Sequence, residues 1–195
     1  MTLREQLRTS LSRLFEEPAA HFLRRLHVPP NAVTLLGLGV TAGAGHLASR
    51  GHFLWAGVAL LFASAMDMLD GTLARLTGKA SPFGAALDSV ADRLAEAIIL
   101  LGVQMHYIRT GDNAIAYLAF GAMVASFMVS YIRARGEGLG VTMKESGLFT
   151  RTERVIVMVA GLLTGWVPAA LAIIFLTSLF SALQRMYHLW KATQK

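Results

Sequence analysis

The feature that most constrains the fold of this chain is a group of four aspartates set between two long apolar runs. They are Asp67, Asp70, Asp88 and Asp92 in a chain of 195 residues. A carboxylate is costly at membrane depth, so ionisable groups inside apolar segments are functional candidates by default. The chain must therefore place these four groups where a counter-charge can neutralise them.

The spacing of the aspartates predicts two helices that meet at a short turn. Asp67 and Asp70 are three residues apart, and Asp88 and Asp92 are four apart, so each pair shares one helix face. Between the pairs, residues 76–82 read Leu-Thr-Gly-Lys-Ala-Ser-Pro, in which glycine and proline act as helix breakers. Helices joined by a short turn pack antiparallel, so the two pairs can face each other.

Four facing carboxylates repel one another unless they take up protons or bind cations. The chain has no cysteine and its six histidines are scattered. Oxygen ligands of this kind favour Mg²⁺, Mn²⁺ or Ca²⁺ over zinc or copper. Gly71, Ala74 and Gly84 keep the neighbouring wall free of bulky side chains, so a phosphate can approach the backbone. Arg75 adds a guanidinium suited to phosphate.

Composition and hydropathy indicate an integral membrane protein. The chain is 54% hydrophobic and 15% charged, whereas soluble domains have about 25% charged residues. We expect an all-α integral membrane protein with six transmembrane helices preceded by an N-terminal amphipathic interfacial helix. Each apolar segment approaches the ~20 residues needed to cross hydrocarbon, although the fifth is short. The six segments are 31–49, 53–75, 82–108, 113–134, 152–167 and 169–190.

The N-terminal segment is predicted to lie on the membrane and not to cross it. In residues 2–26, leucines recur at helical spacing with arginines between them, the pattern of an interfacial amphipathic helix. A helix that binds a partner protein is the alternative. Pro29 and Pro30 end this element, and Asn31 is the expected N-cap of the first span. The chain is thus divided into a juxtamembrane helix, residues 1–30, and a six-helix transmembrane domain, residues 31–195.

The distribution of basic residues predicts the orientation. With the N-terminus in the cytoplasm, fifteen of the 18 Lys and Arg residues fall on the cytoplasmic side, Arg50 and Arg109 fall on the other, and Arg93 lies within a span. By the positive-inside rule, both termini and the aspartates are therefore cytoplasmic in a multi-pass protein of the cell membrane.

The aspartate region resembles the signature of the CDP-alcohol phosphatidyltransferase family at eight positions. The matching residues are Asp67, Asp70, Gly71, Ala74, Arg75, Gly84, Asp88 and Asp92. The resemblance implies a metal-dependent enzyme that binds a CDP-linked lipid such as CDP-diacylglycerol. An alcohol then attacks the lipid-side phosphorus and CMP leaves. It also implies that the four aspartates hold two Mg²⁺ or Mn²⁺ ions and that Asp92 is the general base.

The same resemblance implies which residues contact the CDP-lipid. In this family the start of the first span also contributes, and it matches here as Pro30-Asn31-x2-Thr34. Helix capping alone is the other interpretation of Asn31 and Thr34. The expected CDP-lipid contacts are Asn31, Thr34, Asp67, Gly71, Ala74, Arg75, Ser81 and Gly84.

A second group of residues bears on the acceptor alcohol. The arginines that the topology places at the membrane level of the aspartates are Arg133, Arg135, Arg151, Arg154 and Arg185. Guanidinium groups bind phosphate bidentately, so the acceptor is expected to carry a phosphate. The alternative is that these arginines are exposed and only set the orientation of the protein in the membrane. The Ser-Tyr-Ile-Arg-Ala-Arg, Arg-Thr-Glu-Arg and Gln-Arg pieces resemble those of bacterial phosphatidylinositol phosphate synthases, which implies inositol 3-phosphate.

Several alternatives remain open on sequence alone. Glu96 is either a contact to inositol hydroxyls or a partner for a basic group. Within the family, a phosphatidylglycerophosphate synthase using glycerol 3-phosphate, or an archaeal counterpart using CDP-archaeol, has a similar pattern. A divalent-cation transporter or a structural membrane scaffold is the rival from another class, although a nucleotide explains Arg75 and the small residues better than a bare cation does. A homodimer is implied by the resemblance only.

Overall fold

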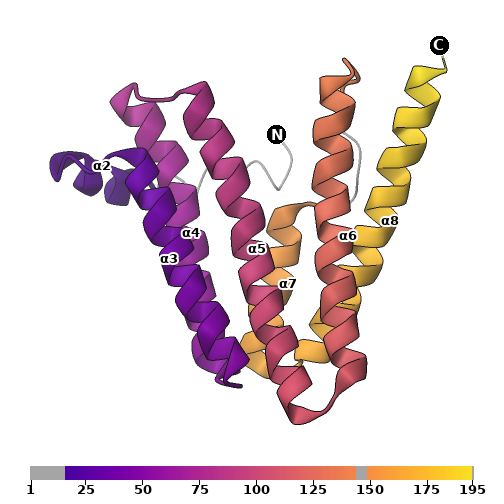
Figure 1. The fold of residues 1–195 in the computed structure, drawn as a ribbon. Helices are drawn as coiled ribbons and strands as arrows, with labels where there is room; N and C mark the ends of the chain where they lie inside the picture. Colours follow the sequence, from indigo (N-terminus) through magenta and orange to yellow (C-terminus); the bar gives the residue numbers. More distant parts are fainter. Residues whose placement is uncertain (1–15, 144–148, 195) are drawn as a thin grey trace. The chain divides into compact units, whose positions relative to one another are not determined.

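The computed structural model describes residues 16–143 and 149–194, and within them every regular element is a helix. The all-helical fold agrees with the prediction. The elements, drawn in Figure 1, are α2 (Glu17–Arg25), α3 (Pro30–Ser49), α4 (Phe53–Thr77), α5 (Pro82–Thr110), α6 (Asn113–Gly138), α7 (Arg151–Thr164) and α8 (Val167–Thr193). The bounds of α3 to α8 differ by at most four residues from the six predicted segments.

Two local predictions were wrong. Helix α3 begins at Pro30, so Asn31 lies inside its first turn and is not the N-cap. Proline suits the first helical position, where its missing N–H is not needed. The fourth predicted segment stops at residue 134, but helix α6 continues to Gly138, so Arg135 is helical. The Arg133 Nε donates to the Glu137 carboxylate over 3.0 Å, an i, i+4 pair that stabilises the additional turn.

Four of the described helices are long and apolar enough to cross a membrane, namely α3, α4, α6 and α8. Helix α7 has only 14 residues, and α5 carries four charged residues between Asp88 and Glu96. Length and composition alone therefore do not identify α5 and α7 as membrane spans. Residues 2–15 of the predicted amphipathic helix lie outside the described residues. The remainder forms α2, whose first turn contains Pro18.

The turn between α4 and α5 is built by the residues that the sequence singles out as breakers. Gly78 adopts a left-handed conformation with φ of 65°, which glycine tolerates without steric cost. Ser81 then caps α5, because its hydroxyl oxygen accepts a hydrogen bond of 3.0 Å from the Gly84 backbone N–H. This turn holds the two aspartate-bearing helices next to each other.

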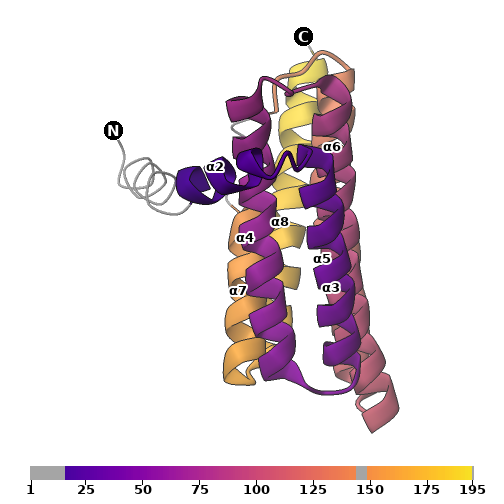
Figure 2. The same cartoon turned by 90° about the vertical axis from the view of Figure 1, so that its left-hand side faces the viewer.

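The chain divides into two compact units, each of which has its own apolar core. The first comprises the described residues up to Ala42 and residues 59–95. In it, α2 runs crosswise to α3, as Figures 1 and 2 show. Buried Ala20, Val33 and Leu73 join α2, α3 and α4 into one apolar cluster.

The second unit comprises residues 43–58 and the described residues from Glu96 onward. Helix α8 packs along α6 and also against α7. Val129, Ile132, Met143 and Ala182 form the apolar cluster between α6, α8 and the loop after α6. Polar groups also lie in this helix contact, since Ser126 and Ser178 share a hydrogen bond of 3.4 Å between their hydroxyls.

Two glycines allow α3 and α5 to touch through their backbones within the second unit. A Cβ atom added at Gly102 would lie 2.2 Å from the Gly45 carbonyl oxygen, and one added at Gly45 would lie 2.7 Å from Ile98 Cγ2. Small residues at such contacts permit close helix association in lipid, where no hydrophobic force drives helices together.

Gly102→Ala is therefore expected to lower the free energy of unfolding by about 1–3 kcal/mol, the usual cost of overpacking. Thermal denaturation in detergent micelles measures this loss. Gly43→Ala is the matched control, because a Cβ atom there meets nothing within 4 Å. If Gly102→Ala were as stable as Gly43→Ala, the backbone contact would not contribute to stability.

Candidate functional site

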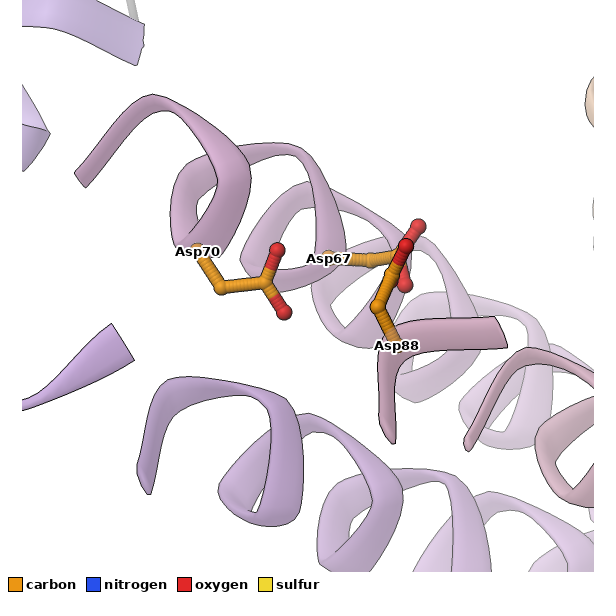
Figure 3. A group of neighbouring side chains, drawn as sticks. All are labelled: Asp67, Asp70 and Asp88. Atoms are coloured by element: carbon orange, nitrogen blue, oxygen red, sulfur yellow. The ribbon is translucent and has the colours of Figure 1, made fainter. Parts of the chain in front are cut away.

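Three of the four aspartates converge in the first unit. One carboxylate oxygen each from Asp67, Asp70 and Asp88 lies within 4.8 Å of the others. Figure 3 shows the three carboxyl groups turned toward one another, Asp67 and Asp70 from α4 and Asp88 from α5. Asp92 lies one turn further along α5 and is not part of this group of three. The group offers only hard oxygen donors, a set that fits Mg²⁺ or Mn²⁺.

Thr34 fixes the orientation of Asp70. Its hydroxyl oxygen lies 2.5 Å from Asp70 Oδ2 and 3.4 Å from the Pro30 carbonyl oxygen. A hydroxyl donates one proton, and the shorter contact indicates that Asp70 receives it. Both side chains are buried, Asp70 being 5% exposed. The Thr34 hydroxyl therefore does more than contact its own helix, because it also holds a carboxylate of the aspartate group.

A cavity of about 210 Å³ adjoins the carboxylates. Seven of the eight residues expected to contact the CDP-lipid line it, and the eighth, Asp67, belongs to the carboxylate group. Lys79 also lines the cavity and was not among the expected contacts, although a basic residue in the turn is a usable signal. The lining residues are Pro30, Asn31, Thr34, Asp70, Gly71, Ala74, Arg75, Lys79, Ala80, Ser81, Gly84, Ala85 and Asp88.

The glycines of the cavity wall keep space open beside polar atoms. A Cβ atom added at Gly71 would lie 3.5 Å from Arg75 Nη1. One added at Gly84 would lie 3.2 Å from the Ser81 hydroxyl oxygen and 3.6 Å from Asn31 Oδ1. An added side chain would crowd the Ser81 hydroxyl at Gly84 and would make an ordinary contact with Arg75 at Gly71. The small wall inferred from the sequence is present.

Arg75 is held by a chain of hydrogen bonds that sequence reasoning missed. Its Nη2 donates to the Thr72 hydroxyl over 2.9 Å, and that hydroxyl donates to Glu16 Oε2 over 2.8 Å. Glu16 directly precedes α2, so the N-terminal segment helps to orient a guanidinium of the cavity. No local sequence signal joins residues 16 and 72.

The second unit gathers three of the five arginines that the sequence singled out, one from each of α6, α7 and α8. The charges of Arg133 and Arg154 repel the guanidinium of Arg185. Arg154 and Arg185 are buried, with 2% and 5% of their surfaces exposed. Arg185 Nη1 donates to the Val129 carbonyl oxygen over 2.7 Å. Arg135 is exposed on α6, and half-buried Arg151 opens α7.

A carboxylate accompanies two of these guanidiniums. Glu96 accepts hydrogen bonds from Arg154, and Glu137 accepts one from Arg133. The basic partner that sequence analysis allowed for Glu96 is therefore Arg154. Arg185 lies within electrostatic range of both Arg133 and Arg154, which repel it, and of Glu137, which attracts it. A bound anion would relieve the repulsion that Arg185 experiences from the other two guanidiniums.

Comparison with known proteins places these observations in a family. The family model described as CDP-alcohol phosphatidyltransferase matches residues 27–190. A phosphatidylinositol phosphate synthase of Corynebacterium glutamicum is 36% identical over 179 residues, covering 87% of this chain and 81% of the relative. An archaetidylinositol phosphate synthase of Pyrococcus horikoshii is 34% identical over 165 residues, covering 85% of each.

The fold also matches a solved structure. It superposes on the Mycobacterium tuberculosis phosphatidylinositol phosphate synthase PgsA1 with CDP-DAG bound, with a TM-score of 0.83 and 26% identity. The match covers 91% of this chain and 94% of that one. A second structure of PgsA1, in complex with manganese and citrate, matches with a TM-score of 0.82.

Proposed function

Because the chain belongs to the CDP-alcohol phosphatidyltransferase family, we propose that it transfers the phosphatidyl group of CDP-diacylglycerol to inositol 3-phosphate and releases CMP. The observation that carries the choice of acceptor is the group of three arginines in the second unit. Arg154 and Arg185 are both buried, and a phosphate on the acceptor would give guanidiniums a bidentate partner that an alcohol without phosphate lacks. Relatives named phosphatidylinositol phosphate synthase support the same acceptor.

We propose that Asp67, Asp70, Asp88 and Asp92 hold two Mg²⁺ or Mn²⁺ ions. When bound, such ions neutralise a pyrophosphate and stabilise the charge that develops on the leaving CMP. Thr34 keeps Asp70 turned toward the other carboxylates. Asp92 takes the proton of the acceptor hydroxyl, whose oxygen forms the new bond to the lipid-side phosphorus as the bond to CMP breaks. A direct displacement of this kind requires no covalent enzyme intermediate.

The cytidine diphosphate would occupy the cavity of the first unit. Arg75 and Lys79 supply positive charge for its phosphates, and Gly71 and Gly84 let them approach the helices closely. Asn31 Oδ1 faces Gly84 from α3 and offers a hydrogen bond to the nucleotide. The chain from Arg75 through Thr72 to Glu16 holds the guanidinium in place.

We further propose that all six helices from α3 to α8 cross the cell membrane and that α2 lies in its interface. The acidic residues of α5 and the short α7 are acceptable at membrane depth if they line a ligand site. The excess of basic residues on the side of the membrane that carries the N-terminus supports a cytoplasmic position for the aspartate site. We propose a homodimer, as the family resemblance implies.

Release of CMP by the purified protein tests this function. CDP-diacylglycerol and Mg²⁺ are supplied with inositol 3-phosphate, glycerol 3-phosphate, free inositol or serine in parallel. Release with inositol 3-phosphate alone is the expected result. Release with glycerol 3-phosphate alone would make the protein a phosphatidylglycerophosphate synthase and overturn the acceptor.

Two further arms distinguish the remaining alternatives. Replacing the lipid by CDP-archaeol tests the lipid class, since archaetidylinositol phosphate synthases are also relatives. Cation flux into liposomes without any CMP release would instead favour a divalent-cation transporter.

A further inference from the structure

We propose that Glu96 is a positioning residue, which holds the Arg154 guanidinium so that one edge of it faces the acceptor phosphate. This inference rests on the proposed function. It assigns Glu96 a role that acts through Arg154 and involves no contact of its own with the substrate.

The geometry of the pair is that of a side-on fork. Arg154 Nε lies 2.6 Å from Glu96 Oε1, and Arg154 Nη2 lies 3.0 Å from Glu96 Oε2. Both side chains are withdrawn from solvent, with 2% of Arg154 and 10% of Glu96 exposed. Two parallel bonds to a carboxylate fix the plane of the guanidinium as well as its position.

The bonds to Glu96 leave one edge of the guanidinium available. A guanidinium has five N–H groups, and the fork uses one on Nε and one on Nη2. Arg154 Nη1 is buried and has no hydrogen-bond partner among the residues that the structure describes. A buried donor left unsatisfied is costly, so an arrangement of this kind is expected where a ligand completes it.

The charges around Arg154 indicate what that ligand is. Arg185 lies within electrostatic range of Arg154, so a group that bonds to Nη1 of Arg154 also experiences the positive charge of Arg185. Glu96 neutralises Arg154 enough to keep it buried in the absence of ligand. The remaining positive field and the open N–H groups suit a phosphate.

A structural role for the pair is the rival explanation, since Glu96 and Arg154 join α5 to α7. Both explanations expect some loss of stability when the pair is broken. Only a positioning role expects a selective change in the KM for the acceptor, because only there does the direction of the guanidinium matter for phosphate.

Two variants of Glu96 test this. Glu96→Gln keeps the shape but loses one acceptor oxygen, and Glu96→Asp keeps the charge but moves the carboxylate back by one methylene. For each variant, CMP release is measured with inositol 3-phosphate varied at saturating CDP-diacylglycerol. It is then measured with CDP-diacylglycerol varied at saturating inositol 3-phosphate. We expect the KM for the acceptor to rise about tenfold in both variants, the effect of one charged hydrogen bond, with the KM for CDP-diacylglycerol changed less than twofold. Asp112→Asn, a conservative change at the N-cap of α6, is the control and is expected to alter neither KM.

A double variant separates action through Arg154 from an independent effect. Adding Glu96→Gln to Arg154→Ala is expected to raise the KM for the acceptor no further than Arg154→Ala does alone. A further tenfold rise would overturn the proposal, and so would an unchanged acceptor KM in Glu96→Asp. If Glu96→Gln does not fold, Glu96→Asp decides the matter, because it retains the buried charge pair.

Failure of the proposed function gives a different result. If the native protein uses glycerol 3-phosphate and not inositol 3-phosphate, the acceptor is wrong, and the same KM comparison is made with glycerol 3-phosphate. If no phosphorylated acceptor supports CMP release, both the function and the role of Glu96 are overturned.

Discussion

Replacing Asp92 by Asn is expected to reduce CMP release by about 10² to 10⁴, the usual contribution of a general base. An amide cannot accept the proton of the acceptor hydroxyl, although its carbonyl oxygen still binds a metal. Steady-state CMP release at saturating concentrations of both substrates measures the loss. Activity within tenfold of the native enzyme would exclude Asp92 as the base.

The fold of the Asp92→Asn variant must be shown to be intact. Stabilisation by Mn²⁺ in a thermal denaturation assay serves as the control, because Asp67, Asp70 and Asp88 still converge in that variant. Asp88→Asn is the informative comparison, since it removes a member of that group. We expect Mn²⁺ to stabilise the Asp92→Asn protein and to stabilise the Asp88→Asn protein less. Loss of Mn²⁺ binding in Asp92→Asn would indicate that Asp92 acts chiefly as a ligand.

Arg185→Ala is expected to raise the KM for inositol 3-phosphate about 30-fold or more, because truncating one partner of a buried charged pair costs 2 kcal/mol or more. Arg185 is buried and lies within electrostatic range of two other arginines, so a bound phosphate would lose one of three guanidiniums. Substrate titrations of CMP release measure the change, and the KM for CDP-diacylglycerol is expected to stay within threefold.

Arg109→Ala is a matched control for Arg185→Ala. Arg109 also donates to a backbone carbonyl, that of Ser49, over 3.2 Å, but it is not one of the three grouped arginines. It should change neither KM. Equal rises in both KM values for Arg185→Ala would show that this residue does not belong to an acceptor site.

Much of the fold was predictable because its determinants are local. The end of α4 and the start of α5 follow from Gly78, Ser81 and Pro82, whose conformational and capping preferences act within one turn of helix. The convergence of Asp67, Asp70 and Asp88 followed from helix periodicity and one tight turn. The end of α6 was not predicted, because Gly136 and Gly138 lie within the helix although glycine commonly ends one.

The contacts that orient the site residues were not predictable, because they join segments far apart in the chain. Glu96 and Arg154 are separated by 58 positions, and Glu16 and Thr72 by 56. Which carboxylate meets which guanidinium depends on how helices pack, and periodicity carries no information on that pairing. Glu96 therefore had two open interpretations until its ion pair with Arg154 was known.

The order of the site residues along the chain has a consequence for biosynthesis. All residues that line the cavity lie between Pro30 and Asp88, whereas the grouped arginines come from α6, α7 and α8. Translation proceeds from the N-terminus, so the ribosome completes the helices that carry the aspartates before it makes the helices that carry the grouped arginines. A substitution in α6, α7 or α8 can therefore act only after the aspartate-bearing helices have been made and their carboxylates have had time to assemble.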